Sequence, residues 1–534
     1  MSAVVETGAG RLQGASTRGL HVFRGVPYAA APSGALRFRP PQPPTPWAGV
    51  RDATRSGPAA PQLALPIFSW INAAARTPGD DCLTLNVFTP GLDCARRPVL
   101  FWIHGGGFMV GSGSTVLYEG QALAERGDVV VVTINYRLGA LGFGHLGAVL
   151  GGELADCTNL GIRDQIAALE WVRENIDRFG GDPDNVTVFG QSAGGMSVAT
   201  LLGAPRARKL FRRAICQSGA ADHVIEREEA ERVAAELVSR LGGPPASHAV
   251  LGRIPIGSLL EAQRGTTARL ANWNSLMVFL PMVDGDVVPE QPIAAIRRGD
   301  TAHIPIMTGA TLEEWKLFGL LDPGIGRFDE NDLRTRLAEV LPADAPPPAE
   351  AARNFQRALG ERSAARSPRE VWSAFQTSRV FHVPSARLAE AQHEGGGCAH
   401  SYLVTWRAPA LRRALGACHA IEIPFVFGNE RHPLARPFSG LGGGGARFAR
   451  RLQRSWLGFA RSGDPSHDRL PTWPRYRPSE RATMILGRVC SLADAPLDAE
   501  RELLVRWKTE RGAARGGVAR PLAPARAYLQ PSTS

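Results

Sequence analysis

Three short apolar runs stand out in the first half of the chain. They read VLFWI at 99–103, VVVVTI at 129–134 and VTVF at 186–189. Each run is continuous rather than alternating and is rich in β-branched residues, which is typical of strands covered on both faces. The pattern therefore predicts three central strands of a mostly parallel sheet.

Helical periodicity follows these strands. In the segment 159–183, apolar residues recur at helical spacing from Ile162 to Ile176, and a glycine pair then marks the end of a helix. A second helix is predicted over AGGMSVATLLGAP at 193–205, directly after the third strand. Strands and helices in this order predict the α/β class, with a large, mostly parallel central sheet and helices on both faces.

The chain has no internal repeat and no clear linker, so residues 1–508 are expected to form a single domain. Strand-like pieces in the first hundred residues predict a small N-terminal sheet. The proline- and charge-rich stretch around 320–370 predicts a surface helical insertion. The glycine run at 441–445 has no preceding strand and no following lysine, so it predicts a flexible loop rather than a phosphate-binding loop. Residues 509–534 are expected to be a disordered tail.

Composition narrows the class of protein further. The 534 residues are 44% hydrophobic and 21% charged, as in ordinary globular proteins. No apolar run reaches the roughly 18–20 residues that span a bilayer. The first residues lack the basic start, apolar middle and cleavage site of a secretory signal. The chain as given is therefore expected to be cytoplasmic, without a membrane partner.

The charged residues and cysteines exclude two kinds of partner. The net charge of +11 would suit nucleic acid, but the basic residues are scattered, and all except Lys209, Lys316 and Lys508 are arginines. Arginine in place of lysine, with abundant Ala, Gly and Pro, is typical of a GC-rich genome, so we expect no nucleic-acid binding. The seven cysteines are odd in number and contain no C-x-x-C pair, which predicts a reducing compartment and no metal site.

The candidate chemistry begins at FGQSAGG, residues 189–195, which follows the third apolar run. One interpretation is a tight turn, because glycine tolerates positive φ. The other is a nucleophile elbow, G-x-S-x-G, that holds Ser192 above the sheet. Chance matches are common in a chain with 59 glycines, so the motif alone does not decide. A serine nucleophile also needs oxyanion donors and, later in the chain, an acid and a histidine.

A glycine run after the first central strand meets the first of these needs. VLFWIHGGGFMVGSG at 99–113 places Gly105–Gly107 beyond a strand end, as in an HGGG-type oxyanion loop. A simple tight turn is the alternative interpretation, but three consecutive glycines beside His104 exceed what a turn needs.

With these two motifs in place, the chain resembles the type-B carboxylesterase family over nearly its whole length. Two long signatures carry the resemblance, DDCLTLNVFTP at 80–90 and FGGDPDNVTVFGQSAGG at 179–195. Shorter segments that correspond are FRGVPYA at 23–29, LRFRPPQP at 36–43, NYRLGALGF at 135–143, PMVDGDVVP at 281–289 and PTWPRY at 471–476. The resemblance implies an α/β-hydrolase fold, a bacterial-type carboxylesterase without cofactor, and Ser192 as the nucleophile.

The resemblance also implies the partners of Ser192. GATLEEW at 309–315 is similar to a family segment whose second acid is the triad member, which implies Glu314. GACHAIEIPFVFGN at 416–429 is similar to the family's histidine segment and implies His419. His104 is the nearest rival histidine, but in this family its position supports the oxyanion loop.

The implied reaction is two-step acyl transfer from a small-molecule ester to water. His419 would take the proton of Ser192, and Glu314 would orient the imidazole ring. Ser218, in the segment QSG, matches a family serine that supports the triad. The implied oxyanion donors are the backbone N–H groups of Gly106, Gly107 and Ala193.

Two departures from the family narrow the expected substrate and setting. Cholinesterases carry glutamate directly before the nucleophile, and Gln191 stands there in this chain, which weakens any case for choline esters. Ala60 stands where secreted members carry the disulfide partner of Cys82, which supports an intracellular setting. Two alternatives stay open: a specialised acyl transferase or carbamate or amide hydrolase on the same triad and, more remotely, a non-catalytic interaction protein. The sequence does not determine the physiological ester, the acyl chain length or the oligomeric state.

Overall fold

The computed structural model describes residues 2–507, except residues 18, 65–76, 246, 274–276, 321, 323, 361–366 and 410–411. The described strands form one mixed sheet in the order β1-β2-β3-β5-β7-β6-β8-β9-β10-β11-β12-β13, with β4 beside β2. The strands are β1 (Ser2–Thr7), β2 (Gly10–Thr17), β3 (Leu20–Pro27), β4 (Val50–Asp52), β5 (Thr84–Thr89), β6 (Arg97–Ile103), β7 (Val130–Ile134), β8 (Gly181–Gln191), β9 (Arg213–Gln217), β10 (Ile306–Thr311), β11 (Ala399–Val404), β12 (Ala482–Leu486) and β13 (Ser491–Asp494).

The three predicted central strands are confirmed as β6, β7 and β8. Strand β6 lies between the other two and pairs in parallel with both, with Val99 opposite Val130 on one side and Val186 on the other. Parallel pairing continues from β8 through β9, β10 and β11 to β12. The carboxyl ends of these strands therefore meet along one edge of the sheet.

The N-terminal strands extend this same sheet. Strand β5 pairs antiparallel with β7 on one side and with β3 on the other, so β1 to β4 continue beyond the parallel region. The small N-terminal sheet expected from the sequence is thus the antiparallel end of the central sheet. The reason is that β5 is buried along its whole length and offers hydrogen-bonding edges to strands on both sides.

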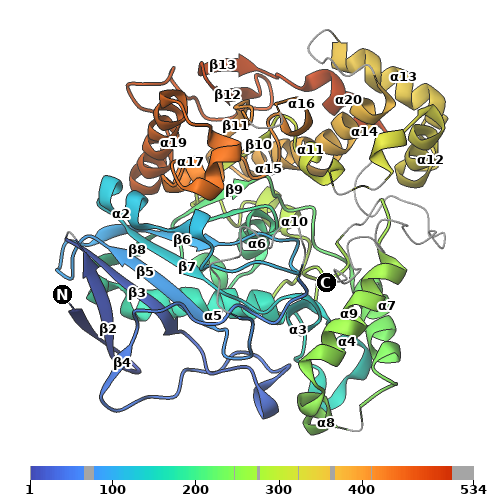
Figure 1. Cartoon of the computed structure of the whole chain (residues 1–534). Coiled ribbons are helices and arrows are strands. Elements are labelled where there is room, and N and C mark those ends of the chain that lie inside the picture. Colours follow the sequence, from blue (N-terminus) through green and yellow to red (C-terminus); the bar gives the residue numbers. More distant parts are fainter. Residues whose placement is uncertain are drawn as a thin grey trace.

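Helices cover both faces of the sheet (Figure 1). The helices of the described chain are α2 (Gln121–Gly127), α3 (Gly139–Phe143), α4 (Gly147–Leu150), α5 (Leu160–Asn175), α6 (Ala193–Gly203), α7 (Arg227–Arg240), α8 (His248–Arg253), α9 (Ile256–Leu270), α10 (Pro292–Arg298), α11 (Trp315–Gly319), α12 (Glu330–Val340), α13 (Pro348–Leu359), α14 (Pro368–Thr377), α15 (Val383–Glu394), α16 (Arg412–Leu415), α17 (Ile423–Phe427), α18 (Arg436–Ser439), α19 (Gly443–Ser462) and α20 (Asp498–Arg506).

Alternate residues of β6 face two separate hydrophobic cores. Phe101 belongs to the core that also contains Ile166 of α5, whereas Trp102 belongs to the core that contains Trp456 of α19. Because successive side chains of a strand point to opposite faces, a strand with apolar residues at every position needs cover on both sides. The continuous apolar runs in the sequence therefore reflect a sheet enclosed between two helical layers.

The predicted helices after β7 and β8 are confirmed as α5 and α6, but the glycine run at 441–445 differs from expectation. Helix α19 begins at Gly443, so Gly443–Gly445 form its first turn rather than a flexible loop, and Leu441 and Gly442 directly precede it. The apolar stripe of this helix, which includes Phe448, Leu452 and Trp456, is buried in the core. Packing of that stripe outweighs the low helix propensity of glycine.

Helices α12, α13 and α14 gather at one side of the molecule (Figure 1). The guanidinium group of Arg336 in α12 lies 3.9 Å from the ring centre of Trp273 and 4.5 Å from that of Phe328. These contacts stabilise the cluster through cation–π attraction. The limits of the insertion and of the single domain stay predictions, and the expected tail at 509–534 lies outside the described residues.

A buried ion pair lies beside the central sheet. Arg137 follows β7 and is 2% exposed, and Asp164 of α5 is fully buried. Asp164 accepts hydrogen bonds from Nε and Nη2 of Arg137 at 2.8 and 2.7 Å, and a third from its backbone N–H at 3.0 Å. This bidentate pairing compensates each charge for the loss of water.

We predict that Asp164→Ala destabilises the protein by about 3–5 kcal/mol, because it leaves the charge of Arg137 buried without its carboxylate. The shift of the urea unfolding curve measures this loss. Glu170→Ala is the matched control, since it removes the partner of Arg206, an arginine that is 74% exposed. The control is expected to cost less than about 1 kcal/mol. Equal losses of unfolding free energy in the two variants would contradict the view that Asp164 compensates the buried charge of Arg137.

Candidate active site

Ser192 occupies a sharp turn between β8 and α6. Its backbone has φ 58° and ψ −128°, a conformation that non-glycine residues rarely adopt. Its N–H donates a hydrogen bond to the carbonyl of Gln217 on the adjacent strand, at 2.9 Å. Ser192 is half-buried, whereas its two neighbours are buried. The turn therefore leaves Ser192 partly exposed at the carboxyl edge of the sheet.

The glycine loop after β6 lies directly against this turn. A Cβ atom on Gly105 would sit 2.6 Å from the carbonyl oxygen of Gln191 and 3.1 Å from the Cβ of Ser192. Gly106 has φ 113°, and a Cβ there would sit 1.9 Å from the carbonyl oxygen of Val110. A side chain at Gly105 would push the loop away from Ser192, and one at Gly106 would collide with Val110 within the loop, so both glycines are needed for this arrangement.

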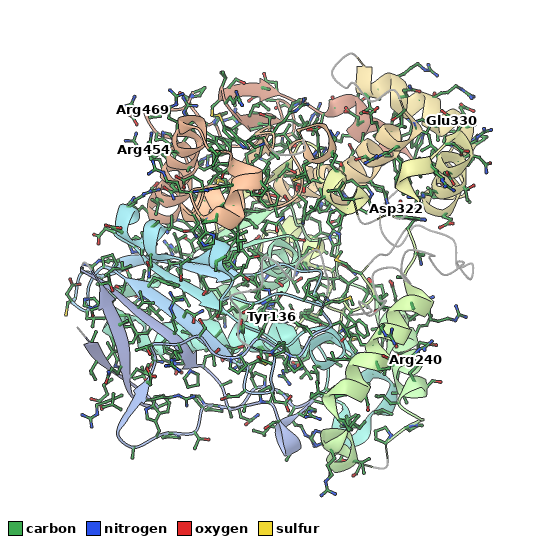
Figure 2. The ribbon with its side chains drawn as sticks, in the orientation of Figure 1. Tyr136, Arg240, Asp322, Glu330, Arg454 and Arg469 are labelled. Carbon is green, nitrogen blue, oxygen red and sulfur yellow. The ribbon has the colours of Figure 1, made fainter. Side chains whose placement is uncertain are left out.

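His104, the other candidate for the catalytic histidine, directly precedes the glycine loop. Its Nδ1 contacts the carbonyl of Gly105 at 2.8 Å, and its ring stacks on Tyr136 with 4.5 Å between ring centres. Tyr136 is fully buried, and its label lies well inside the outline of the molecule in Figure 2. Burial lowers the pKa of His104 to about 4, against the opposing effect of the hydrogen bond to Gly105. A neutral, enclosed ring of this kind supports the loop.

Glu314 and His419 meet in the core of the site. Oε2 of Glu314 lies 2.5 Å from Nδ1 of His419, and the two side chains are 0% and 7% exposed. Burial by itself raises the pKa of Glu314, but the charge of His419 and the hydrogen bonds from His419, Ser218 and the N–H of Thr311 outweigh burial and hold that pKa below its ordinary value. Glu314 is therefore a carboxylate at neutral pH.

The other carboxylate oxygen of Glu314 is also held by two donors. Oε1 accepts hydrogen bonds from the hydroxyl of Ser218 at 2.6 Å and from the N–H of Thr311 at 2.6 Å. Both carboxylate oxygens are thus fixed before any substrate arrives. Glu313, the neighbouring acid, bonds instead with Lys316 at 2.6 Å and with the N–H of Ala417 at 2.8 Å. The structure thus separates the two adjacent glutamates as the motif implies.

The structure brings Glu314, His419 and Ser218 into one bonded chain but does not join Ser192 to it directly. Among the described residues, no hydrogen bond is formed by the hydroxyl of Ser192. Its neighbour Gln191 provides the link, because the side-chain amide nitrogen lies 3.1 Å from Nε2 of His419. Catalytic hydrogen bonds are often long or unformed before substrate binds.

Glu422 is a buried acid that the sequence reasoning missed. It is 1% exposed, and its Oε1 accepts a hydrogen bond from Nε2 of Gln217 at 3.0 Å. Gln217 in turn accepts one from Nε1 of Trp456 at 3.0 Å. Burial, reinforced by the charge of Glu314, raises the pKa of Glu422 to about 7. The sequence did contain a signal for a buried acid, because Glu422 lies three residues after His419 and among apolar residues.

Two phenylalanine rings flank His419. Phe318 and Phe381 each place their ring centre 5.0 Å from that of the imidazole. They form an apolar wall beside the imidazole ring. No group of three or more His, Cys, Asp or Glu residues in the described ranges is arranged to hold a metal ion.

Comparison with known proteins identifies the family of this chain. The chain matches the profile of the Carboxylesterase family over residues 1–499. It is 36% identical over 517 residues to the para-nitrobenzyl esterase of Bacillus subtilis (strain 168), covering 95% of this chain and 99% of that one. It is 37% identical to the phenmedipham hydrolase of Pseudarthrobacter oxydans, covering 91% and 95%. A carboxylesterase structure from Geobacillus stearothermophilus superposes with a TM-score of 0.83 at 40% identity, covering 94% and 99%.

The fold and the relatives define the class as α/β-hydrolases, as the resemblance implied. This chain belongs to the carboxylesterase family and is a carboxylic ester hydrolase. In the part of the chain that the structure describes, no helix combines the length and apolar character needed to cross a bilayer.

The raised pKa of Glu422 predicts how the stability of the protein depends on pH. An unfolded glutamate loses its proton near pH 4.5, whereas folded Glu422 keeps it until about pH 7. Its contribution is therefore fully present below pH 4.5 and is lost as the pH rises through 7, by roughly 3 kcal/mol. Glu422→Gln removes this loss, so the variant is expected to exceed the native protein in stability at pH 8 but not at pH 4.5.

Urea unfolding between pH 4.5 and 8 measures this difference. Glu480→Gln, at an exposed carboxylate near Arg477, is the control and should follow the native curve. Parallel curves for the native protein and Glu422→Gln would contradict the prediction.

Proposed function

We propose that this carboxylesterase hydrolyses small, neutral carboxylic esters by two-step acyl transfer, with Ser192 as nucleophile. His419 is the general base and Glu314 the carboxylate that orients it. The bonded chain from Ser218 through Glu314 to His419 carries this proposal, because it ends on a ring that contacts the residue directly before Ser192.

Proton transfer follows from the arrangement of Glu314 and His419. The ionised carboxylate of Glu314 accepts from Nδ1, so Nδ1 carries the hydrogen of the neutral imidazole. Nε2 is then left without a proton and can accept one from the hydroxyl of Ser192. Glu314 stabilises the imidazolium that results, and the bonds from Ser218 and Thr311 fix its position.

Attack of Ser192 on the ester carbonyl produces an oxyanion that needs donors. The donors we assign are the backbone N–H groups of Gly106, Gly107 and Ala193. The close approach of Gly105 to Ser192 supports the first two, since it brings the loop to the reacting hydroxyl. Ala193 is the first residue of α6, where N–H groups are free to face an anion. Each donor is worth roughly 3 kcal/mol.

The second half of the reaction reverses these roles. The imidazolium of His419 donates its proton to the leaving alcohol, and the neutral ring then takes a proton from water. The activated water attacks the acyl-enzyme and releases the acid and Ser192. The proposed cycle therefore needs no reactant other than the ester and water.

The surroundings of His419 support a neutral, apolar substrate. Phe318 and Phe381 flank its ring, and Met277 lies beside the glycine loop, 3.8 Å from where a Cβ of Gly107 would stand. The name of the Bacillus subtilis relative, a para-nitrobenzyl esterase, suits such a substrate. We assign a broad range of esters on this basis. A cytoplasmic location stays a prediction, and the seven cysteines, all free thiols, are compatible with it.

We predict that Ser192→Ala lowers kcat by about 10⁴–10⁶-fold and Glu314→Gln by about 10⁴-fold, with little change in KM. The first removes the nucleophile, and the second removes the charge that stabilises the imidazolium. Release of p-nitrophenol from acyl esters measures both. Glu313→Gln is the matched control and should stay within a few-fold of the native rate, because Glu313 bonds to Lys316 instead. Full activity of Ser192→Ala would refute the mechanism.

The same assay, run with p-nitrophenyl esters of increasing acyl length, tests the breadth of the substrate range. Comparable kcat/KM values over several lengths are expected. Negligible activity on this series, with strong activity on a single carbamate, amide or acyl acceptor, would instead favour a specialised enzyme on the same triad.

A further inference from the structure

The side chain of Gln191 is held against the imidazole of His419. Its amide nitrogen lies 3.1 Å from Nε2 and 3.5 Å from Nδ1 of the ring, and Gln191 is 3% exposed. An atom nearly equidistant from both ring nitrogens cannot lie along the in-plane lone pair of either one without colliding with the ring carbons. The amide therefore lies over the face of the ring.

This placement leaves the in-plane lone pair of Nε2 open for the hydroxyl of Ser192. It also determines which end of the amide faces the ring. Nδ1 donates to Glu314, so the ring offers electron density and no second N–H, and the N–H₂ end of Gln191 is the complementary group. The positive end of a dipole next to the ring disfavours the imidazolium form.

The other groups near His419 either favour the imidazolium, opposite to the effect of Gln191, or carry no charge. Glu314, after β10, is bonded to Nδ1 and favours the imidazolium. Glu422, at the start of α17, does so when ionised, although burial favours its neutral form. Phe318 and Phe381 flank the ring without charge. Gln191, at the end of β8, thus supplies the opposing electrostatic influence.

We propose that Gln191 is a positioning residue that holds the ring of His419 in place and, through the N–H₂ end of its amide, disfavours the imidazolium relative to a carboxylate in the same position. This rests on the proposed function, in which neutral His419 is the base. The glutamine thereby extends ester hydrolysis toward acidic pH. A glutamate at this position would stand over the ring as a further carboxylate and would favour the inactive imidazolium.

Two substitutions at Gln191 keep the length of the side chain and change the charge that it places over the ring. Gln191→Met removes the dipole, and Gln191→Glu replaces its positive end with a carboxylate. The acidic limb of kcat/KM for a p-nitrophenyl ester should therefore lie at lowest pH in the native enzyme, higher in Gln191→Met and highest in Gln191→Glu. The shift expected for glutamate is about one pH unit or more. KM for the neutral ester should change less than about twofold, because Gln191 acts through His419.

Gln453→Glu is the matched control for a new buried carboxylate. Gln453 is 2% exposed and accepts a hydrogen bond from Arg126 at 2.7 Å, so a glutamate there gains a cation and lies outside the site. Its pH profile should match the native one. The pH of the acidic limb is expected to rise from the native enzyme to Gln191→Met and then to Gln191→Glu. Any other order of the three would overturn the proposal. If Gln191→Glu fails to fold, the comparison of Gln191→Met with the native enzyme decides by the same criterion.

Labelling with a fluorophosphonate separates this proposal from the one on which it rests. Labelling of Ser192 in the native enzyme, together with unshifted limbs in both Gln191 variants, would refute the role of Gln191 alone. Absence of label on Ser192 in an active native enzyme would refute the triad itself.

Discussion

The strained backbone of Ser192 is the constraint on which the rest of the site depends. A positive φ with ψ near −128° costs a serine on the order of 1–3 kcal/mol, so the surrounding structure has to impose it. Strand β8 fixes one side of the turn, α6 begins at once on the other, and the carbonyl of Gln217 holds the N–H of Ser192. Gly194 belongs to the same constraint, because a Cβ there would sit 2.1 Å from the carbonyl oxygen of Ile103.

The main charge in the site is the carboxylate of Glu314, which is hydrogen-bonded by protein groups in place of water. Glu314 is fully buried, yet the charge of His419 and three hydrogen bonds, from His419, the hydroxyl of Ser218 and the backbone N–H of Thr311, keep it ionised. Glu422, three residues after His419, accepts one side-chain hydrogen bond from the described residues, from Gln217, and favours the neutral form. The same core thus contains one acid held as an anion and one that favours its neutral form. Both are buried, and the difference lies in the neighbouring charge, His419 for Glu314 and Glu314 for Glu422, and in the number of hydrogen bonds.

Local patterns in the sequence were enough for the three central strands and the helices that follow them, whereas the glycine-rich motif around Ser192 did not by itself decide between a turn and a nucleophile elbow. Continuous apolar runs predict β6, β7 and β8 because each strand has a core on either face. The pairing of Gln217 with Glu422 and Trp456 could not be predicted in this way, since the partners are 205 and 239 residues apart and meet only through the sheet order. The first turn of α19 was also missed, because tertiary packing of Phe448 and Trp456 overrides the glycine run. Resemblance to the family pointed to Glu314 and His419, whereas the contact of Gln191 with the ring depends on coordinates.

Rapid acid quenching during turnover of a p-nitrophenyl ester, followed by mass analysis of the peptides, tests the central claim most directly. The account predicts that the acyl mass appears on the peptide that contains Ser192 and is absent from the Ser192→Ala protein. An acyl group on another residue, or turnover without any acyl-enzyme at quench times shorter than one catalytic cycle, would contradict it.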